Sequence, residues 1–263
     1  DADGNPNVPP DGTREALRVQ HWAAVELHLE ALQDIFADLS ISARHAKVPA
    51  ALVDLVNADA KLDLVPPELL RFLNDEPFRH RVAQVMGKLR RALSDPAAYP
   101  AETFIADISM LRDSLEEAGL SVLARAGKVA RLLRRAETFR LRLAAMDVRR
   151  HSERHEEAVA ELLRLAGVCD DYASIKEGKR LELLERELAT PRPLHAASMT
   201  LSDDTRRILH VREILKSAVE LDRNSVGSYI VSMTHEVSDV LEVLLLMKEA
   251  GLWDTSGGNS GGR

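Results

Sequence analysis

The sequence has a single cysteine, Cys169, among 263 residues. One thiol excludes an internal disulfide and a zinc site built from cysteines, and it is typical of a reducing compartment. No apolar run approaches the roughly 20 residues needed to cross a bilayer, and the N-terminus lacks the basic and apolar pattern of a signal peptide. We therefore expect a cytoplasmic protein with no membrane partner.

A large excess of charge of one sign is also missing. The formal net charge is −7, so no global field directs the chain toward nucleic acid or an anionic membrane surface. Arginines and one lysine are dense between Arg125 and Arg154, but no series of aromatic residues is interleaved with them to stack on bases. This run predicts a solvated helix face with some residues near an anion site, and no nucleic-acid partner is expected.

What the sequence contains favours helices. Aromatic residues make up 4% of the chain, hydrophobic residues 45% and charged residues 29%, and the abundance of Ala, Leu, Glu and Arg excludes an all-β fold. Apolar residues recur at helical spacing, and Pro and Gly separate the periodic segments. This spacing predicts helices at about 13–46, 76–93, 101–118, 176–188, 203–220 and 238–250.

The segment from Leu120 to Leu165 has two interpretations, one very long helix or a helix, a strand and another helix. Phe139, Leu141, Leu143 and Ala145 alternate with less apolar residues, which favours a strand at about 140–149. A β-rich run predicts a second strand at about 228–233. We predict one helical region over 1–252 and a flexible Gly/Ser-rich tail or linker over 253–263, with further chain before and after these residues.

Three separated segments carry recognisable motifs in a fixed order. Residues 1–8 read D-A-D-G-N-P-N-V and resemble G-G-D-R-D-G-N-P, and residues 146–155 read M-D-V-R-R-H-S-E-R-H and resemble L-D-I-R-Q-E-S-x-R-H. Residues 229–251 contain Y-I-V-S-M, S-D-V-L and K-E-A-G, similar to Y-x-I-S-M, P-S-D-V-L and K-E-A-G. Each motif alone is weak, but the ordered set resembles the phosphoenolpyruvate carboxylases over essentially the whole chain.

This resemblance implies a mainly α chain that forms the helix-rich part of a β/α barrel, with the motifs at the C-terminal ends of strands, where barrel enzymes place their chemistry. It implies formation of oxaloacetate and phosphate from phosphoenolpyruvate and bicarbonate. The complete enzyme would use Mg or Mn. The implied partners are these two substrates, the remainder of the enzyme chain and identical subunits in a tetramer.

Several family features are missing or altered. The T-A-H-P-T segment with the catalytic His, the two acidic metal ligands and the later Gly- and Arg-rich loops are not among these residues, so we expect the isolated chain to be inactive and to bind no metal alone. Ala2, Arg150-His151 and Val237 stand where the family has Arg, Gln-Glu and Pro, which puts the fine geometry in question. The alternative is a non-catalytic helical scaffold or interaction protein derived from the family.

Arg149 is the main candidate for substrate binding. A planar guanidinium at a strand end can bind phosphate or carboxylate oxygens through two parallel hydrogen bonds, which Lys cannot do. The resemblance assigns the matching Arg to the substrate anion. The competing interpretation is a surface Arg paired with Glu153 or Asp147.

The remaining candidates are scaffold residues of the site: Asp3, Asn5, His155, Ser232 and Asp239. Each also has a structural interpretation: a tight turn for Asp3 and Asn5, a hydrogen-bonded role for His155, a bond to backbone for Ser232 and helix capping for Asp239. His151 and His155 have the four-residue spacing of a zinc-binding pair, but no further Cys or His completes a ligand set. No metal ligand is therefore predicted.

Overall fold

The computed structural model describes residues 10–196 and 198–253. Asp3 and Asn5, and all of the expected tail except Trp253, lie outside these ranges. Of the residues that the structure describes, about 65% lie in helices and 5% in strands, which confirms the predicted helix-rich class. Contacts divide it into two compact units, one over Arg18–Ala144 and one made of Asp1–Leu17 with Ala145–Arg263. We call them the helical unit and the strand-bearing unit, and the single region over 1–252 stays a prediction.

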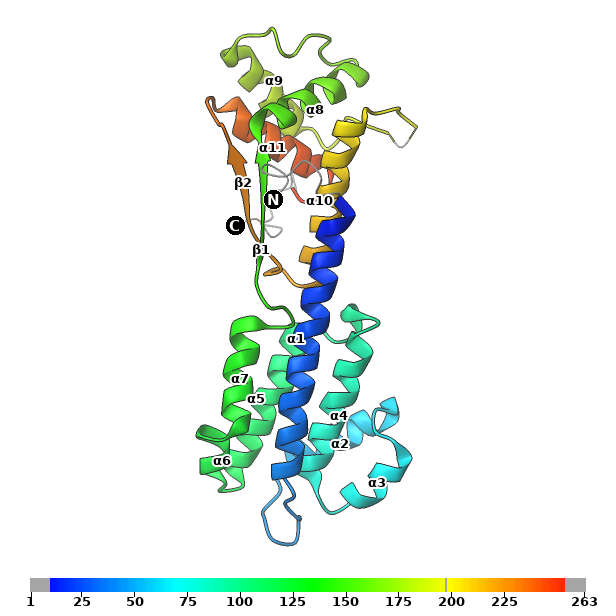
Figure 1. Cartoon of the computed structure of the whole chain (residues 1–263), viewed down its shortest axis with the longest axis vertical. Helices are drawn as coiled ribbons and strands as arrows, with labels where there is room; N and C mark the ends of the chain where they lie inside the picture. The colour runs from blue at the N-terminus through cyan, green and yellow to red at the C-terminus, as the bar shows by residue number, and fades with distance from the viewer. Residues whose placement is uncertain (1–9, 197, 254–263) are drawn as a thin grey trace. The chain divides into compact units, whose positions relative to one another are not determined.

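The helical unit is built from α-helices and short 3-10 turns (Figure 1). Its elements are most of α1 (Pro10–Asp38), then α2 (Ala50–Asp59), η1 (Ala60–Leu62), α3 (Pro67–Leu73), α4 (Pro77–Ala92), η2 (Pro96–Ala98), α5 (Ala101–Glu117), α6 (Ser121–Arg125) and α7 (Lys128–Phe139). The first helix is shorter than the predicted 13–46, because the chain turns after Asp38 and the Ala43 amide donates to the Asp75 carbonyl at 2.7 Å.

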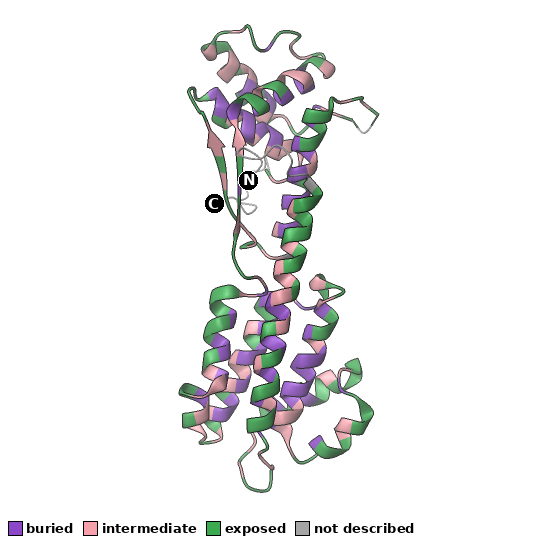
Figure 2. Ribbon diagram, in the orientation of Figure 1, coloured by how far each residue is buried: buried purple, intermediate pink, exposed green. Residues whose placement is uncertain are grey.

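Apolar stripes at helical spacing form the core of the helical unit (Figure 2). On α4 the large apolar side chains buried in this core include Phe78, Val82, Val85 and Leu89. They recur every three or four residues, so they lie on one face of the helix. Equivalent stripes on α1, α5 and α7 pack against the same cluster, which is the pattern that the sequence predicted.

A buried cluster of charges also joins three helices of this unit. Arg81 of α4 is fully buried and binds Asp59 of α2 and Asp107 of α5, the latter at 2.6 Å. Lys88 contacts the same two carboxylates at 2.6 and 3.1 Å, and the Tyr99 hydroxyl donates to Asp107 at 2.6 Å. Opposite charges balance one another here, as burial requires.

The strand predicted at 140–149 is partly wrong. A strand does follow a helix, but it runs over Met146–His151 as β1, and α7 continues to Phe139. Arg140 has a φ of +57°, and its carbonyl accepts from Nε2 of His28 at 2.7 Å. Leu141 is buried in the helical core. These contacts hold the segment as a turn, so the apolar alternation there did not indicate a strand.

In its described residues, the strand-bearing unit holds a two-stranded parallel sheet, four complete helices and the first residues of α1 (Figure 1). Its elements are β1 (Met146–His151), α8 (Ser152–Leu165), α9 (Glu177–Ala189), α10 (Asp203–Leu221), β2 (Val226–Ser232) and α11 (Ser238–Glu249). The second strand begins and ends slightly earlier than the predicted 228–233, and Met233 follows it with a φ of +57°. Parallel strands need a long crossover, and α8 to α10 supply it.

The register of the sheet is fixed by a bulge near the start of both strands. Met146 pairs with Val226, whereas Val148 pairs with Tyr229, so β2 carries one extra residue. The Ser228 amide of this bulge donates to the Asp147 carboxylate at 2.7 Å. A Cβ atom at Gly227 would lie 2.5 Å from the same carboxylate. Glycine is therefore required there for Asp147 to reach the amide.

A second buried cluster lies between α8, α9 and α11. Glu242 of α11 is fully buried and accepts a hydrogen bond from the Tyr172 hydroxyl at 2.9 Å, and its other oxygen has no partner among the described residues. Burial raises the pKa of Glu242 to about 7. The carboxylates of Glu156 and Asp239 act in the same direction, and the Tyr172 hydroxyl and Arg180 oppose them.

We predict that Glu242 makes the stability of this unit depend on pH. Because the folded pKa lies above the unfolded value of 4.5, the protonated carboxyl stabilises the fold below about pH 4.5, and this contribution is lost as the pH rises through about 7. Glu242→Gln should therefore stabilise the protein at pH 8 by up to about 3 kcal/mol, at about 1.4 kcal/mol per pKa unit. Urea unfolding at pH 5 and pH 8 measures this, and an equal midpoint shift at both pH values would contradict it.

Candidate functional site

The two faces of the parallel sheet have different surroundings. Val148 and its partner Tyr229 pack against Val211 and Leu215 of α10. Successive side chains of a strand point to opposite faces. Arg149 and its partner Ile230 therefore share the other face, where Arg149 is exposed and Ile230 is 43% exposed. We call these the packed face and the exposed face.

The neighbouring arginines Arg149 and Arg150 are thus separated by the sheet. Arg150 pairs with Val231 on the packed face, and its positive charge contributes to lowering the pKa of His155 beneath that face. Arg149 is directed away from these groups, on the side that carries the Asp147 carboxylate. Of the two guanidinium groups, the one on the exposed face is Arg149.

Hydroxyl groups fix the C-terminal ends of both strands. Ser232 donates from Oγ to the Arg150 carbonyl at 3.3 Å, and Ser152 donates to the Met233 carbonyl at 2.7 Å. His151 accepts at Nδ1 from the Glu153 amide at 3.3 Å and so caps the start of α8. The strand ends are held by contacts that cross from one motif to the other.

Asp239 closes the loop that follows β2. One carboxylate oxygen accepts from the amides of His235 at 2.7 Å and Glu236 at 3.0 Å. The adjacent Ser238 donates through its amide and hydroxyl to Glu177 of α9 at 2.9 and 2.7 Å. Asp239 therefore stabilises the loop before α11 and does not cap the helix, which has no side-chain cap bond at Val237. Its role in a site stays a prediction.

His155 is part of a buried group that sequence analysis did not assemble. Its Nε2 lies 2.9 Å from the Tyr229 hydroxyl, and the fully buried Arg212 donates from Nη2 to the same hydroxyl oxygen at 3.3 Å. The signal for Tyr229 was its place in the Y-I-V-S-M motif. The signal for Arg212 was a charged residue on an apolar stripe of α10, one turn after Ile208 and beside Val211.

The described residues do not form a metal site. Within 10–196 and 198–253 no group of three or more His, Cys, Asp or Glu side chains could hold a metal ion. The divalent metal implied by the resemblance has no ligand set here. Among the helices of the same ranges, none has the length and apolar character needed to cross a membrane.

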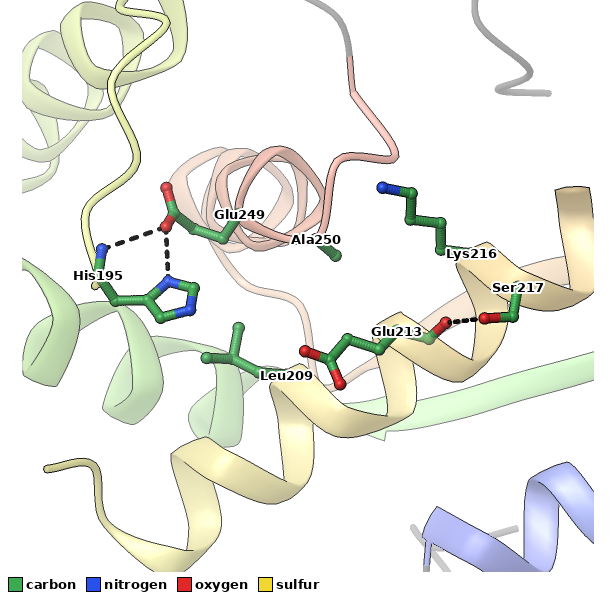
Figure 3. A pocket seen from close by; sticks show the side chains of 7 residues that line it. All are labelled: His195, Leu209, Glu213, Lys216, Ser217, Glu249 and Ala250. Atoms are coloured by element: carbon green, nitrogen blue, oxygen red, sulfur yellow. Dashed lines mark hydrogen bonds and ion pairs between the residues drawn. The ribbon is translucent and has the colours of Figure 1, made fainter. Parts of the chain in front are cut away.

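A pocket of about 380 Å³ lies elsewhere in the strand-bearing unit, between α10 and the end of α11 (Figure 3). It is lined by His195, Leu209, Glu213, Lys216, Ser217, Glu249 and Ala250. Glu249 accepts from Nδ1 of His195 at 2.9 Å and from the Leu194 amide at 3.0 Å. These bonds fasten the segment before α10 to α11, and none of the predicted site residues that the structure describes lines the pocket.

Comparison with known proteins agrees with the motifs. The family profile "Phosphoenolpyruvate carboxylase" matches residues 1–261. The chain is 44% identical over 260 residues to the phosphoenolpyruvate carboxylase of Rhodothermus marinus, covering 96% of this chain and 28% of that protein. The enzyme of that name from Roseiflexus castenholzii is 37% identical over 271 residues, covering 96% and 29%.

The corresponding protein of Mycobacterium leprae is 36% identical over 273 residues, covering 98% of this chain and 28% of its own length. The chain thus spans less than a third of the length of the curated relatives that it matches. The family profile and these relatives cover nearly all of this chain, so the protein belongs to the phosphoenolpyruvate carboxylase family.

Proposed function

We propose that this chain is part of a phosphoenolpyruvate carboxylase that forms oxaloacetate and phosphate from phosphoenolpyruvate and bicarbonate, and that Arg149 binds an anionic group of phosphoenolpyruvate. The observation that carries the proposal is the exposure of Arg149 on the face of the sheet opposite α10, within a chain of this family. Phosphate and carboxylate groups both match the two-pronged donor geometry of a guanidinium.

The arrangement of the sheet supports a place for Arg149 inside a β/α barrel. In such barrels helices cover the outer face of each strand, and side chains of the other face point into the barrel. Here α10 covers the packed face, so the exposed face corresponds to the interior. Arg149 lies near the C-terminal end of β1, which is the end where barrel enzymes carry out their chemistry.

The role that follows for Arg149 is binding and orientation of the substrate. A fixed guanidinium would hold the substrate anion in one orientation. The reaction with bicarbonate would then cost less translational and rotational entropy. A divalent metal such as Mg or Mn, when bound by the complete enzyme, would stabilise developing negative charge. The residues that bind this metal in the family are not among the 263 residues of this chain. As the resemblance implies, the complete enzyme would be a cytoplasmic tetramer.

We predict that purified residues 1–263 do not carboxylate phosphoenolpyruvate, because the family's metal ligands and catalytic His motif are not among them. A coupled assay for oxaloacetate with Mg or Mn, compared with the complete protein at equal concentration, measures this. Metal-dependent oxaloacetate formation by residues 1–263 above the blank would contradict the prediction. A complete protein that folds but shows no turnover would support the alternative of a non-catalytic scaffold.

A further inference from the structure

Three side chains from three elements meet at a single oxygen beneath the packed face. His155 comes from α8, Arg212 from α10 and Tyr229 from β2. The Tyr229 hydroxyl lies 2.9 Å from Nε2 of His155 and 3.3 Å from Nη2 of Arg212. The guanidinium carbon of Arg212 also lies 5.0 Å from the centre of the Tyr229 ring, within the range of a cation–π contact.

The direction of each hydrogen bond follows from the chemistry of the groups. Arg212 can only donate, so the Tyr229 oxygen accepts from it. Burial, followed by the charges of Arg212 and Arg150, lowers the pKa of His155 to about 3. The imidazole is therefore neutral. We assign the tautomer in which Nε2 is the acceptor, because the Tyr229 hydroxyl, which already accepts from Arg212, can then donate its one hydrogen to Nε2. Each of the three groups thus orients the next.

The cluster is costly to bury. Arg212 is fully buried, and it also donates a hydrogen bond from Nη1 to the Val243 carbonyl at 3.2 Å. Nε of Arg212 and Nδ1 of His155 have no hydrogen-bond partner among the described residues. A buried cation without a carboxylate destabilises a fold. An apolar set of side chains would hold the elements together at lower cost, which points to a role beyond packing.

The position of Tyr229 gives that role. Its backbone pairs with Val148, the residue before Arg149, at the first regular pair after the bulge. The bonds of the Tyr229 side chain to α8 and α10 therefore hold β2 in place at the residue that pairs with Val148. This pairing sets which residues of β1 face α10. A shift of β1 by one residue would move Arg149 to the packed face.

We propose that the Tyr229 hydroxyl, held by His155 and Arg212, is a positioning group that fixes the direction of Arg149. This inference rests on the proposed function of Arg149 as the contact to the substrate anion. Tyr229 does not touch the substrate. It acts through the strand pair, so removal of its hydroxyl has a functional effect only while Arg149 is present.

The test is a double-mutant cycle in the complete enzyme with Tyr229→Phe and Arg149→Ala. Tyr229→Phe should lower kcat/KM for phosphoenolpyruvate by about 10- to 100-fold, the loss that a misplacement of about 1 Å can cause, mainly through KM. In the Arg149→Ala background the same change should alter kcat/KM by less than about 2-fold, because additivity fails for coupled residues. Unfolding midpoints check that each variant is folded.

Three further variants separate positioning from loss of stability. Tyr172→Phe removes another buried hydroxyl bond of the same unit, to Glu242, and should change kcat/KM by the same small factor in both backgrounds. His155→Gln keeps an acceptor for the Tyr229 hydroxyl and should retain more activity than His155→Leu. The two His155 variants also test the inference if Tyr229→Phe does not fold.

Equal losses from Tyr229→Phe in both backgrounds, or no loss in the wild-type background, would overturn the inference and leave the role of Arg149 intact. A harmless Arg149→Ala would instead overturn the proposed role of Arg149, and the positioning of that residue with it.

Discussion

Replacing Arg149 by Ala in the complete enzyme should weaken productive use of phosphoenolpyruvate by about 2 to 5 kcal/mol, the range for removing one partner of a hydrogen-bonded charge pair. This corresponds to a loss in kcat/KM of roughly 30-fold to several thousand-fold, at about 1.4 kcal/mol per decade. Arg149→Lys should recover only part of the loss, because the charge remains and the two-pronged geometry does not. Steady-state kinetics with varied phosphoenolpyruvate measure both variants.

Arg150→Ala is the matched control for this experiment. Arg150 is the next residue along β1 and carries the same charge, but it lies on the packed face. Its removal should change kcat/KM much less than removal of Arg149, and circular dichroism checks the fold of each variant. If Arg149→Ala matches the wild type, or if Arg150→Ala is the more damaging change, the anion site does not lie on the exposed face at Arg149.

Replacing Arg81 by Met should destabilise the helical unit by about 3 to 5 kcal/mol, because Asp59 and Asp107 would keep buried charge with only Lys88 to balance it. The side chains of Asp59, Asp107 and Lys88 are largely buried, at 14%, 12% and 15% exposed. Hydrogen exchange of the α4 amides measures this unit separately from the rest of the chain. Met has a similar length to Arg, so the change removes charge and hydrogen bonds more than volume.

The control is the exposed pair of Arg44 and Asp75. Its atoms are also close, at 2.8 Å, but the side chains are 76% and 58% exposed. Arg44→Met should therefore cost less than about 1 kcal/mol. If the two variants have equal effects on α4 exchange, burial does not determine the contribution of Arg81.

The pH dependence of the Arg81 effect has a defined sign. Burial opposes ionisation of Asp59, but hydrogen bonds from Lys88 and Arg81 outweigh it and lower its pKa from the ordinary value of 3.8. This contribution to stability is present above pH 3.8 and is lost as the pH falls through the folded pKa. The difference between wild type and Arg81→Met should accordingly narrow in that acidic range.

Helices were the most predictable part of the fold. The predicted ranges 101–118 and 203–220 match Ala101–Glu117 and Asp203–Leu221 within one residue at each end, because a stripe of apolar residues and a following break are local signals. The turn at 140–145 was not predictable in this way. It depends on His28, more than 110 residues earlier, whose ring binds the Arg140 carbonyl. The alternation of apolar residues within a short segment contains no information about a contact with a residue so distant in the sequence.

The candidate site residues also divide into those indicated by local sequence signals and those that depend on long-range packing. Motif order identified Arg149 as a candidate from neighbouring residues alone, and its role stays a prediction. The alternation of β1 then places Arg149 and Arg150 on opposite faces of the sheet. The group formed by His155, Tyr229 and Arg212 needed the crossover to bring α8, β2 and α10 together. Arg212 alone has no motif, and its burial under the sheet depends on long-range packing.

The most direct test of the proposed function follows labelled carbon in the complete protein. The protein is incubated with phosphoenolpyruvate, a divalent metal and ¹³C-bicarbonate, and oxaloacetate and phosphate are quantified together. We expect label from bicarbonate in oxaloacetate, with phosphate released in equal amount, and loss of both signals in Arg149→Ala. A folded complete protein that consumes no phosphoenolpyruvate, or that releases phosphate without labelled oxaloacetate, would contradict the proposed reaction.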